Sequence, residues 1–176
     1  MKGFILYSKS SYALEQYDKA FEYIIQAQNA ATKINDPILA SSIITFKGLC
    51  YFRLGFYKEA DQTLKSVIPI VKTIKNQEDI HYHLASIYSN LAANYEQLGN
   101  KKARDLYNEK AYNESRQLEK SNKYLWGVAV TAANRGNRFA RQKQYDSAEF
   151  YLNKALRLAN AYNDKRIFKK NSPCML

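Results

Sequence analysis

The sequence predicts an all-α protein, a right-handed superhelix (α-solenoid) of about four antiparallel helix pairs followed by an incomplete fifth. Three observations predict this fold class. Apolar residues recur with a period near 3.6 along almost all of the 176 residues, which is the spacing of an amphipathic helix. No stretch alternates apolar and polar residues between hairpin turns, so no strand is expected. A short phrase, a tyrosine followed by two polar residues and an alanine, recurs along the chain.

The recurring phrase sets the repeat length. Three full copies end in Ala20, Ala60 and Ala148, and a shortened relative without the tyrosine ends in Ala103. These alanines are spaced by 40, 43 and 45 residues. Self-similarity at a period of this size is typical of stacked helical repeats, in which each unit buries its apolar face against its neighbours. The copies are Tyr17-Asp18-Lys19-Ala20, Tyr57-Lys58-Glu59-Ala60, Asn100-Lys101-Lys102-Ala103 and Tyr145-Asp146-Ser147-Ala148.

Helix-breaking residues place the first four helices. Asp36 is a good N-cap and Pro37 suits the first position of a helix, so a helix begins there. Gly55 can take the left-handed conformation that ends a helix. Because the loops are short, neighbouring helices are expected to run antiparallel. The predicted helices are 2–14, 17–34, 37–54 and 57–75.

Helix-breaking residues also divide the second half of the chain into helices. Gly99-Asn100 and Lys143-Gln144 are short breaks, whereas Asn76–Asp79 and Ser121–Lys123 are longer breaks that begin new pairs. Asn163-Asp164 repeats the longer break, so another first helix is expected to begin there. The predicted helices are 79–98, 101–119, 123–142 and 145–163.

These helices form one predicted domain, residues 1–171, followed by a disordered tail at 172–176. A repeat array normally ends in a polar capping helix, and the sequence shows none. We therefore expect either a truncated arm of a larger protein or an exposed apolar edge that favours self-association. The repeats are expected at about 1–35, 36–78, 79–121 and 122–163, with the start of a fifth at 164–171.

The chain is basic, with a formal net charge of +11. The excess lies in residues 124–176, which carry ten basic and three acidic groups. This asymmetry has two readings: the solvated face of the last helices, or a surface for an acidic partner or nucleic acid. Arg135, Arg138 and Arg141 recur every three residues on one helix face, so they are the best candidates for phosphate contacts.

The sequence excludes several classes of protein. No apolar run approaches the roughly 18 residues of a membrane span. The glycines are scattered, so there is no phosphate-binding loop, and no nucleophile elbow is present. His81 and His83 are two residues apart and face different sides of a helix, so no metal site is predicted. Cys50 is expected as a buried, reduced thiol, which favours a cytoplasmic protein. We expect no catalytic residues and no cofactor.

Particular positions recur within the repeats. On the first helices of the second, third and fourth pairs, a small residue precedes a large aromatic by three positions. A turn with Gly-x-Tyr character and a small residue on the second helix follow. The matching residues are Gly48, Tyr51, Gly55, Tyr57, Ala60 and Leu64 in the second repeat, Leu91, Ala92, Tyr95, Gly99 and Ala111 in the third, and Gly136, Phe139, Tyr145, Ala148, Leu152 and Ala155 in the fourth.

These residues resemble the tetratricopeptide repeat (TPR) family. The repeat here is about 43 residues long, against about 34 for the usual unit. Long repeats of this kind resemble the sensor and regulatory arrays of bacterial transcriptional regulators, including those of Bacteroidetes. The resemblance implies a concave groove lined by polar positions of each first helix.

Carried over position by position, the expected groove residues are Arg53, Asn90, Asn134, Asn137 and Arg141. Asparagine can both donate to and accept from a peptide backbone, and arginine offers a fork suited to a carboxylate.

Two further observations concern which partner could bind and what role Trp126 has. Ile5 and Thr45 stand where the carboxylate clamp of chaperone-binding members would have Lys or Asn, so chaperone-tail binding is not predicted. Trp126 is expected to pack in the core against the preceding second helix, with an aromatic anchor on a binding face as the alternative.

The sequence thus predicts a non-catalytic scaffold that binds a protein or peptide segment in its groove. We expect it to act as a regulatory or sensor module, or as a truncated arm of a larger signalling or transcription regulator. The alternative is a basic helical solenoid that binds nucleic acid. That alternative ranks second because no regular two-residue code recurs at each repeat.

Overall fold

The computed structural model describes residues 1–121 and 123–171, with side chains described as far as residue 163. Within these ranges the chain is helical and contains no strand, which confirms the predicted fold class. The elements are α1 (Lys2–Ala13), α2 (Tyr17–Ala31), α3 (Pro37–Arg53), α4 (Tyr57–Val71), α5 (Gln77–Gln97), α6 (Lys101–Ser115), the short 3-10 helix η1 (Arg116–Leu118), α7 (Leu125–Arg141) and α8 (Tyr145–Asn171).

The predicted breaks are capped by the side chains expected of them. Asp36 accepts hydrogen bonds from the N–H groups of Ile38 and Leu39 at 2.9 and 3.1 Å, and Pro37 is the first residue of α3. Asn76 caps α5 and Asn100 caps α6 in the same way, each accepting one N–H at 3.0 Å. These bonds satisfy N–H groups that a helix leaves unpaired at its start.

The turn inside each helix pair has one geometry in all four pairs. Gly55 and Gly99 have positive φ angles of 82° and 70°, as predicted for residues that end a helix. Glu15 and Lys143 occupy the same place in the first and last pairs, both with φ of 60°. The turns share a backbone hydrogen bond of 2.9–3.0 Å, formed by Gln16→Ser11, Phe56→Tyr51, Asn100→Tyr95 and Gln144→Phe139.

This geometry corrects the register of the third repeat. In each pair, the carbonyl of the residue that caps the second helix accepts a hydrogen bond from the N–H four residues later. That N–H belongs to Ala20, Ala60 and Ala148 in three pairs and to Arg104 in the third pair. The shortened phrase ending in Ala103 is therefore one residue out of register. Arg104 stands where the other repeats have the small alanine.

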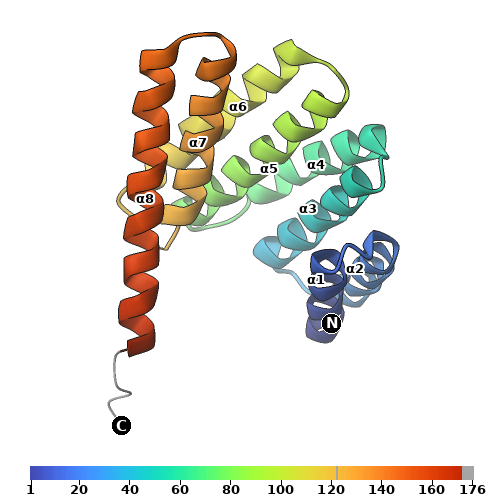
Figure 1. Cartoon of the computed structure of the whole chain (residues 1–176). Coiled ribbons are helices and arrows are strands. Elements are labelled where there is room, and N and C mark those ends of the chain that lie inside the picture. Colours follow the sequence, from blue (N-terminus) through green and yellow to red (C-terminus); the bar gives the residue numbers. More distant parts are fainter. Residues whose placement is uncertain (122, 172–176) are drawn as a thin grey trace.

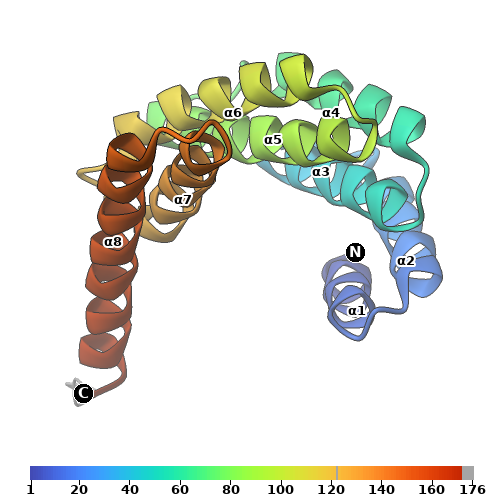
Figure 2. The same ribbon diagram turned by 45° about the horizontal axis from the view of Figure 1, so that its top comes forward.

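The helix pairs stack side by side into an arch (Figure 1). Figure 2 shows α1, α3, α5 and α7 on the inner side of this arch and α2, α4 and α6 on its outer side. The helices α1 and α8 lie at opposite ends of the arch. The first helix of every pair therefore faces the concave side.

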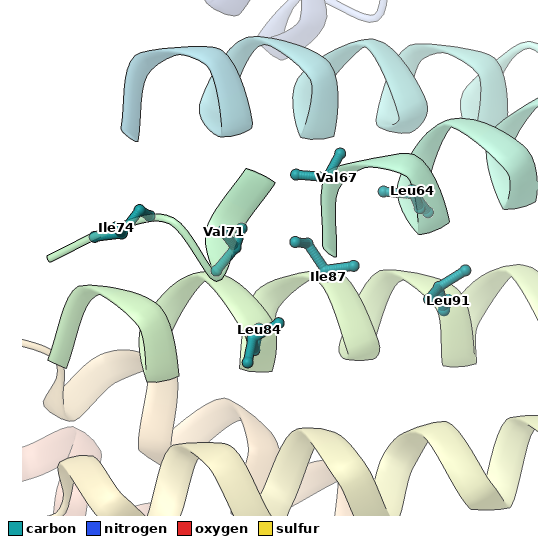
Figure 3. Packing of buried hydrophobic residues seen from close by; sticks show 7 residues of the cluster. All are labelled: Leu64, Val67, Val71, Ile74, Leu84, Ile87 and Leu91. Atoms are coloured by element: carbon teal, nitrogen blue, oxygen red, sulfur yellow. The ribbon is translucent and has the colours of Figure 1, made fainter. Parts of the chain in front are cut away.

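The core is divided into clusters between neighbouring helices. The largest lies where α4 packs on α5, and its residues are at most 6% exposed (Figure 3). Burying an aliphatic side chain of this size contributes about 1.5–3 kcal/mol, so this junction is a strong one. Its members are Leu64, Val67, Val71, Ile74, Leu84, Ile87 and Leu91.

The length of α8 differs from the prediction. The break predicted at Asn163-Asp164 is absent, because α8 continues without interruption to Asn171. A helix ends only where capping or packing stops it, and Asn and Asp alone impose a modest propensity cost. Residues 164–171 are thus the last turns of α8. The predicted tail at 172–176 lies outside the described residues, and the division into repeats stays a prediction.

Candidate binding groove

Four small hollows follow one another along the inner side of the arch, and together we call them the inner groove. Their volumes are about 190, 190, 180 and 260 Å³, and α5 contributes residues to every one. Ser86, Ser89, Asn90 and Ala93 of α5 each line two of them, so the hollows adjoin. A larger hollow of about 660 Å³ lies elsewhere, at the loops before α3 and α5, and contains none of the predicted site residues.

Three predicted residues meet in one of these hollows, here called the polar hollow. Asn134, Asn137 and Arg141 of α7 all line its 190 Å³. The spacing of three and four residues puts them on one face of the helix. The remaining lining comes from α5 and α6: Ser89, Ala92, Ala93, Glu96, Arg104 and Asn108.

The polar groups of this hollow are largely unused by the fold. Within the described part of the chain, the side chains of Asn108, Asn134, Asn137 and Arg141 make no hydrogen bond or ion pair. Arg104 differs, because its Nη1 lies 2.7 Å from Glu96 and its Nε 2.8 Å from Asp105. These two carboxylates raise the pKa of Arg104. The hollow therefore offers amides and one free guanidinium to a ligand.

The other two predicted residues meet in the neighbouring hollow of 260 Å³. Arg53 of α3 and Asn90 of α5 both line it, with Tyr12 and Leu49. Arg53 is already engaged, since its Nε donates to the Tyr12 hydroxyl at 2.9 Å and its guanidinium lies 5.6 Å from that ring centre. This hydrogen bond raises the pKa of Arg53. Asn90 makes no such bond in the described chain and connects this hollow to the next.

The remaining two hollows are mainly apolar and lie on either side of Tyr82. The Tyr82 ring stacks on Tyr124 with centres 4.5 Å apart. In one hollow the hydroxyl oxygen of Thr45 is buried and has no hydrogen-bond partner. His83 lines the same hollow, and burial lowers its pKa. This end of the inner groove suits apolar side chains.

Arg104 and Asn108 are the site residues that the sequence did not reveal. In the structural register they correspond to Ala60 and Leu64 of the second pair, and to Ala148 and Leu152 of the fourth. The signal was present in the short turn at Gly99-Asn100. Moving the register by one residue replaces an apolar pair by an arginine and an asparagine.

The row of arginines on α7 is not a uniform cationic stripe. Arg135 and Arg138 both bind the carboxylate of Glu109, the latter at 3.0 Å. Their side chains are only 16% and 14% exposed, and Arg135 lies 4.5 Å from the ring centre of Tyr112. Two of the three predicted phosphate contacts are thus held largely inside the fold by one shared carboxylate, and Arg141 is the member that reaches the groove.

Other residues that the sequence singled out lie apart from the groove. Trp126 is 52% exposed and contacts Tyr162 of α8 at 5.8 Å between ring centres, so the expected core packing against the preceding helix is wrong. His81 Nδ1 lies 2.8 Å from Glu114. Cys50 is fully buried, and this burial raises the pKa of its thiol to about 12.

The described part of the chain holds no candidate metal site and no candidate membrane helix. Among residues 1–121 and 123–163, no group of three or more His, Cys, Asp or Glu side chains could hold a metal ion. None of the helices in these ranges combines the length and the apolar character needed to cross a membrane.

Comparison with known proteins identifies the family. Residues 9–143 match the model of a family described as the SusR N-terminal TPR domain, SusR being a regulator of Bacteroidetes. No curated protein sequence matches the chain. The matched segment includes α2 to α6 and reaches past the end of α7, so it covers most of the inner groove. TPR domains generally act as non-catalytic scaffolds for protein interactions. The chain therefore belongs to the family of SusR-type N-terminal tetratricopeptide repeat domains.

Proposed function

We propose that this chain is a non-catalytic scaffold that holds an extended peptide or protein segment in its inner groove. The observation that carries the proposal is the polar hollow, where the side chains of Asn108, Asn134, Asn137 and Arg141 make no hydrogen bond or ion pair within the described chain. Polar groups that the fold leaves unused cost little to keep solvated and can bond a ligand directly.

The shape of the inner groove supports an extended ligand. The residues of α5 that line its four hollows run from Tyr82 to Glu96, which corresponds to a rise of about 21 Å. An extended chain rises about 3.3 Å per residue, so about six residues could lie along this part of the helix. Several small, adjoining hollows fit successive side chains of one segment better than a single compact ligand.

The family suggests a wider role. We propose that the groove serves as a sensor or regulatory module within a larger signalling or transcription regulator, because the family to which the chain belongs is described as the N-terminal TPR domain of a regulator. The cytoplasmic location expected from the sequence belongs to the same proposal.

The groove is tested by replacing Asn134 and Asn137 together with alanine. A peptide is first selected on the folded chain from a library of random twelve-residue peptides displayed on phage. The double variant should bind that peptide at least about tenfold more weakly, because each lost amide removes hydrogen bonds to the peptide backbone. Binding is measured by fluorescence anisotropy, and folding by circular dichroism.

Asn113 and Asn153 are exposed on α6 and α8, outside the groove. Their double alanine variant is the matched control and should bind as tightly as the parent chain. Equal affinity of the Asn134/Asn137 variant would remove the groove as the binding site.

We also propose that the chain self-associates through one face of α8. Leu152 corresponds to Leu64 of α4, and each packs beneath the glycine of its own first helix. Leu64 is fully buried because α5 covers it, whereas Leu152 and its neighbour Leu156 are 38% and 61% exposed. An uncovered face of this kind favours association with a second copy.

Light scattering with size-exclusion chromatography tests this self-association. We expect a dimer whose proportion rises with concentration, and we expect Leu156→Glu to abolish it. Leu106 is 53% exposed on α6, so Leu106→Glu is the control that should leave the dimer intact. A monomer at all accessible concentrations would contradict the proposal.

A further inference from the structure

The walls of the inner groove carry an excess of positive charge. Its four hollows contain four basic residues, Lys9, Arg53, Arg104 and Arg141, and a single acidic residue, Glu96. Glu96 is held by Arg104 at 2.7 Å. Within the described chain, neither Lys9 nor Arg141 has an ion-pair partner. Uncompensated charge on a concave wall attracts ligands of the opposite sign.

The polar hollow is built at positions that are apolar elsewhere in the same chain. Position 108 is leucine in the pairs before and after it, at Leu64 and Leu152. Leu64 is a central member of the largest core cluster. A polar side chain at such a position lacks the stabilisation that burial of an aliphatic group provides. Asn108 makes no compensating hydrogen bond, because no described residue bonds its side chain.

The inner face also changes character along the arch. Phe46, Asn90 and Asn134 occupy equivalent positions on α3, α5 and α7, nine residues before the turn that follows each helix. Leu49, Ala93 and Asn137 occupy the equivalent positions six residues before that turn. At these two positions α3 is apolar and α7 carries amides. Along α5, the two hollows that share Tyr82 are mainly apolar, whereas the hollow lined by Glu96 is polar. A ligand that fills both kinds of hollow must carry apolar and polar side chains.

We infer that the polar hollow is a carboxylate subsite, which takes the side chain of an aspartate or glutamate in an extended segment whose neighbouring residues are apolar. This inference rests on the proposed function of the inner groove. Arg141 supplies the charge, and Asn108, Asn134 and Asn137 supply amide N–H donors. Charge-assisted hydrogen bonds to a carboxylate are about twice as strong as neutral ones.

The spacing of the two ends predicts the spacing within the ligand. Tyr82 lies between the apolar hollows, and Ser89 lines the polar one, seven residues further along α5. Seven residues of helix span about 10 Å, which equals about three residues of extended chain. The acidic residue should therefore stand about three positions from a large apolar residue.

The inference is tested by selection and then by paired peptides. The phage library fuses each peptide through its C-terminus, so that only side chains provide carboxylates. Selected peptides should share an Asp or Glu about three positions from Leu, Ile, Phe or Met. One selected peptide is then synthesised with an amidated C-terminus, together with its Asn or Gln analogue. The amide analogue should bind at least about tenfold more weakly.

Two variants test whether the preference for an acidic residue arises in the polar hollow. In Arg141→Ala, the acidic peptide and its amide analogue should bind with equal affinity, because the coupling between the two charges is lost. Asn108→Leu introduces the leucine found in the pairs before and after it and should shift the preference from the acidic residue to leucine. Arg157 is exposed on α8 outside the groove, so Arg157→Ala is the matched control and should keep the preference for the acid.

The outcomes separate the two proposals. Selected peptides without an acidic residue, or an acid preference that survives in Arg141→Ala, would overturn the carboxylate subsite and leave the peptide groove standing. Failure to select any peptide on the folded chain would overturn the groove itself. Arg141-dependent binding of a single-stranded oligonucleotide, without any selected peptide, would also overturn both and identify a phosphate backbone as the anionic ligand.

Discussion

Four residues at equivalent turns hold a left-handed backbone, and only two of them are glycine. A residue with a Cβ atom pays roughly 1–2 kcal/mol for this conformation, whereas glycine does not. Glu15 and Lys143 adopt this conformation, each with φ of 60°, and are therefore strained. The shared backbone hydrogen bond of the turn compensates for it, so the turn survives where its usual residue is missing.

Lys143→Gly should therefore stabilise the chain by about 0.5–1 kcal/mol, because the relief of strain exceeds the added freedom of the unfolded chain. Urea unfolding followed by circular dichroism measures the change. Lys143→Ala is the matched control and should bring no such gain, since alanine keeps the Cβ atom. Gly99→Ala should destabilise by about 1 kcal/mol, although no atom lies near its new Cβ. A loss of stability in Lys143→Gly would contradict the argument.

At the scale of elements, the junction between the third and fourth pairs is held by polar contacts. Asp79, in the first turn of α5, accepts hydrogen bonds from the hydroxyl of Tyr124 and from Lys123 Nζ, the latter at 2.9 Å. Both donors precede α7. The hydrogen bond from Tyr124 is the largest cause that lowers the pKa of Asp79, and the bond from Lys123 comes next. This contact fixes the start of α7 against α5.

The lowered pKa gives the junction a defined pH dependence. A carboxylate with a lower pKa in the folded state adds stability above its unfolded pKa of about 3.9, and that stability is lost as the pH falls through the folded value. Asp79→Asn should therefore destabilise the chain by about 1 kcal/mol at pH 7 and have little effect at pH 2. Urea unfolding at both pH values measures this difference.

Glu149 is exposed on α8 and makes no ion pair in the described chain. Glu149→Gln is the control and should change stability little at either pH. An equal loss in Asp79→Asn at pH 7 and pH 2 would show that the carboxylate charge does not hold this junction.

At the scale of the whole molecule, contacts join each helix mainly to its neighbours along the arch. Stability in such an array is the sum of local units and of the interfaces between them. The ends have one neighbour and the middle has two. The end helix α1 buries only Ser8 and Ser11 fully, whereas α4 and α5 share the largest apolar cluster.

Hydrogen exchange should follow this gradient. Amides of α4 and α5 should exchange at least about tenfold more slowly than those of α1, because opening the middle breaks two interfaces and opening the end breaks one. Exchange followed by mass spectrometry of short peptides resolves the helices. Uniform protection along the chain would indicate instead that the array unfolds as a single cooperative unit.

The sequence by itself determined the helices and their order. Caps such as Asp36 and turn glycines such as Gly55 act within a few residues, so their positions can be read from local sequence. The helical periodicity then placed Asn134, Asn137 and Arg141 on one face of α7, and the structure brings them together in one hollow. Whether they bind a ligand stays a prediction.

Only the tertiary structure decided which side chains meet across helices. It moved the third repeat by one residue and so brought Arg104 and Asn108 into the groove, and it placed Arg135 and Arg138 on Glu109. Local sequence determines where a helix starts, but a one-residue shift turns every side chain by about 100°. Contacts between helices depend on that angle and on the neighbour opposite, and neither can be read from one segment alone.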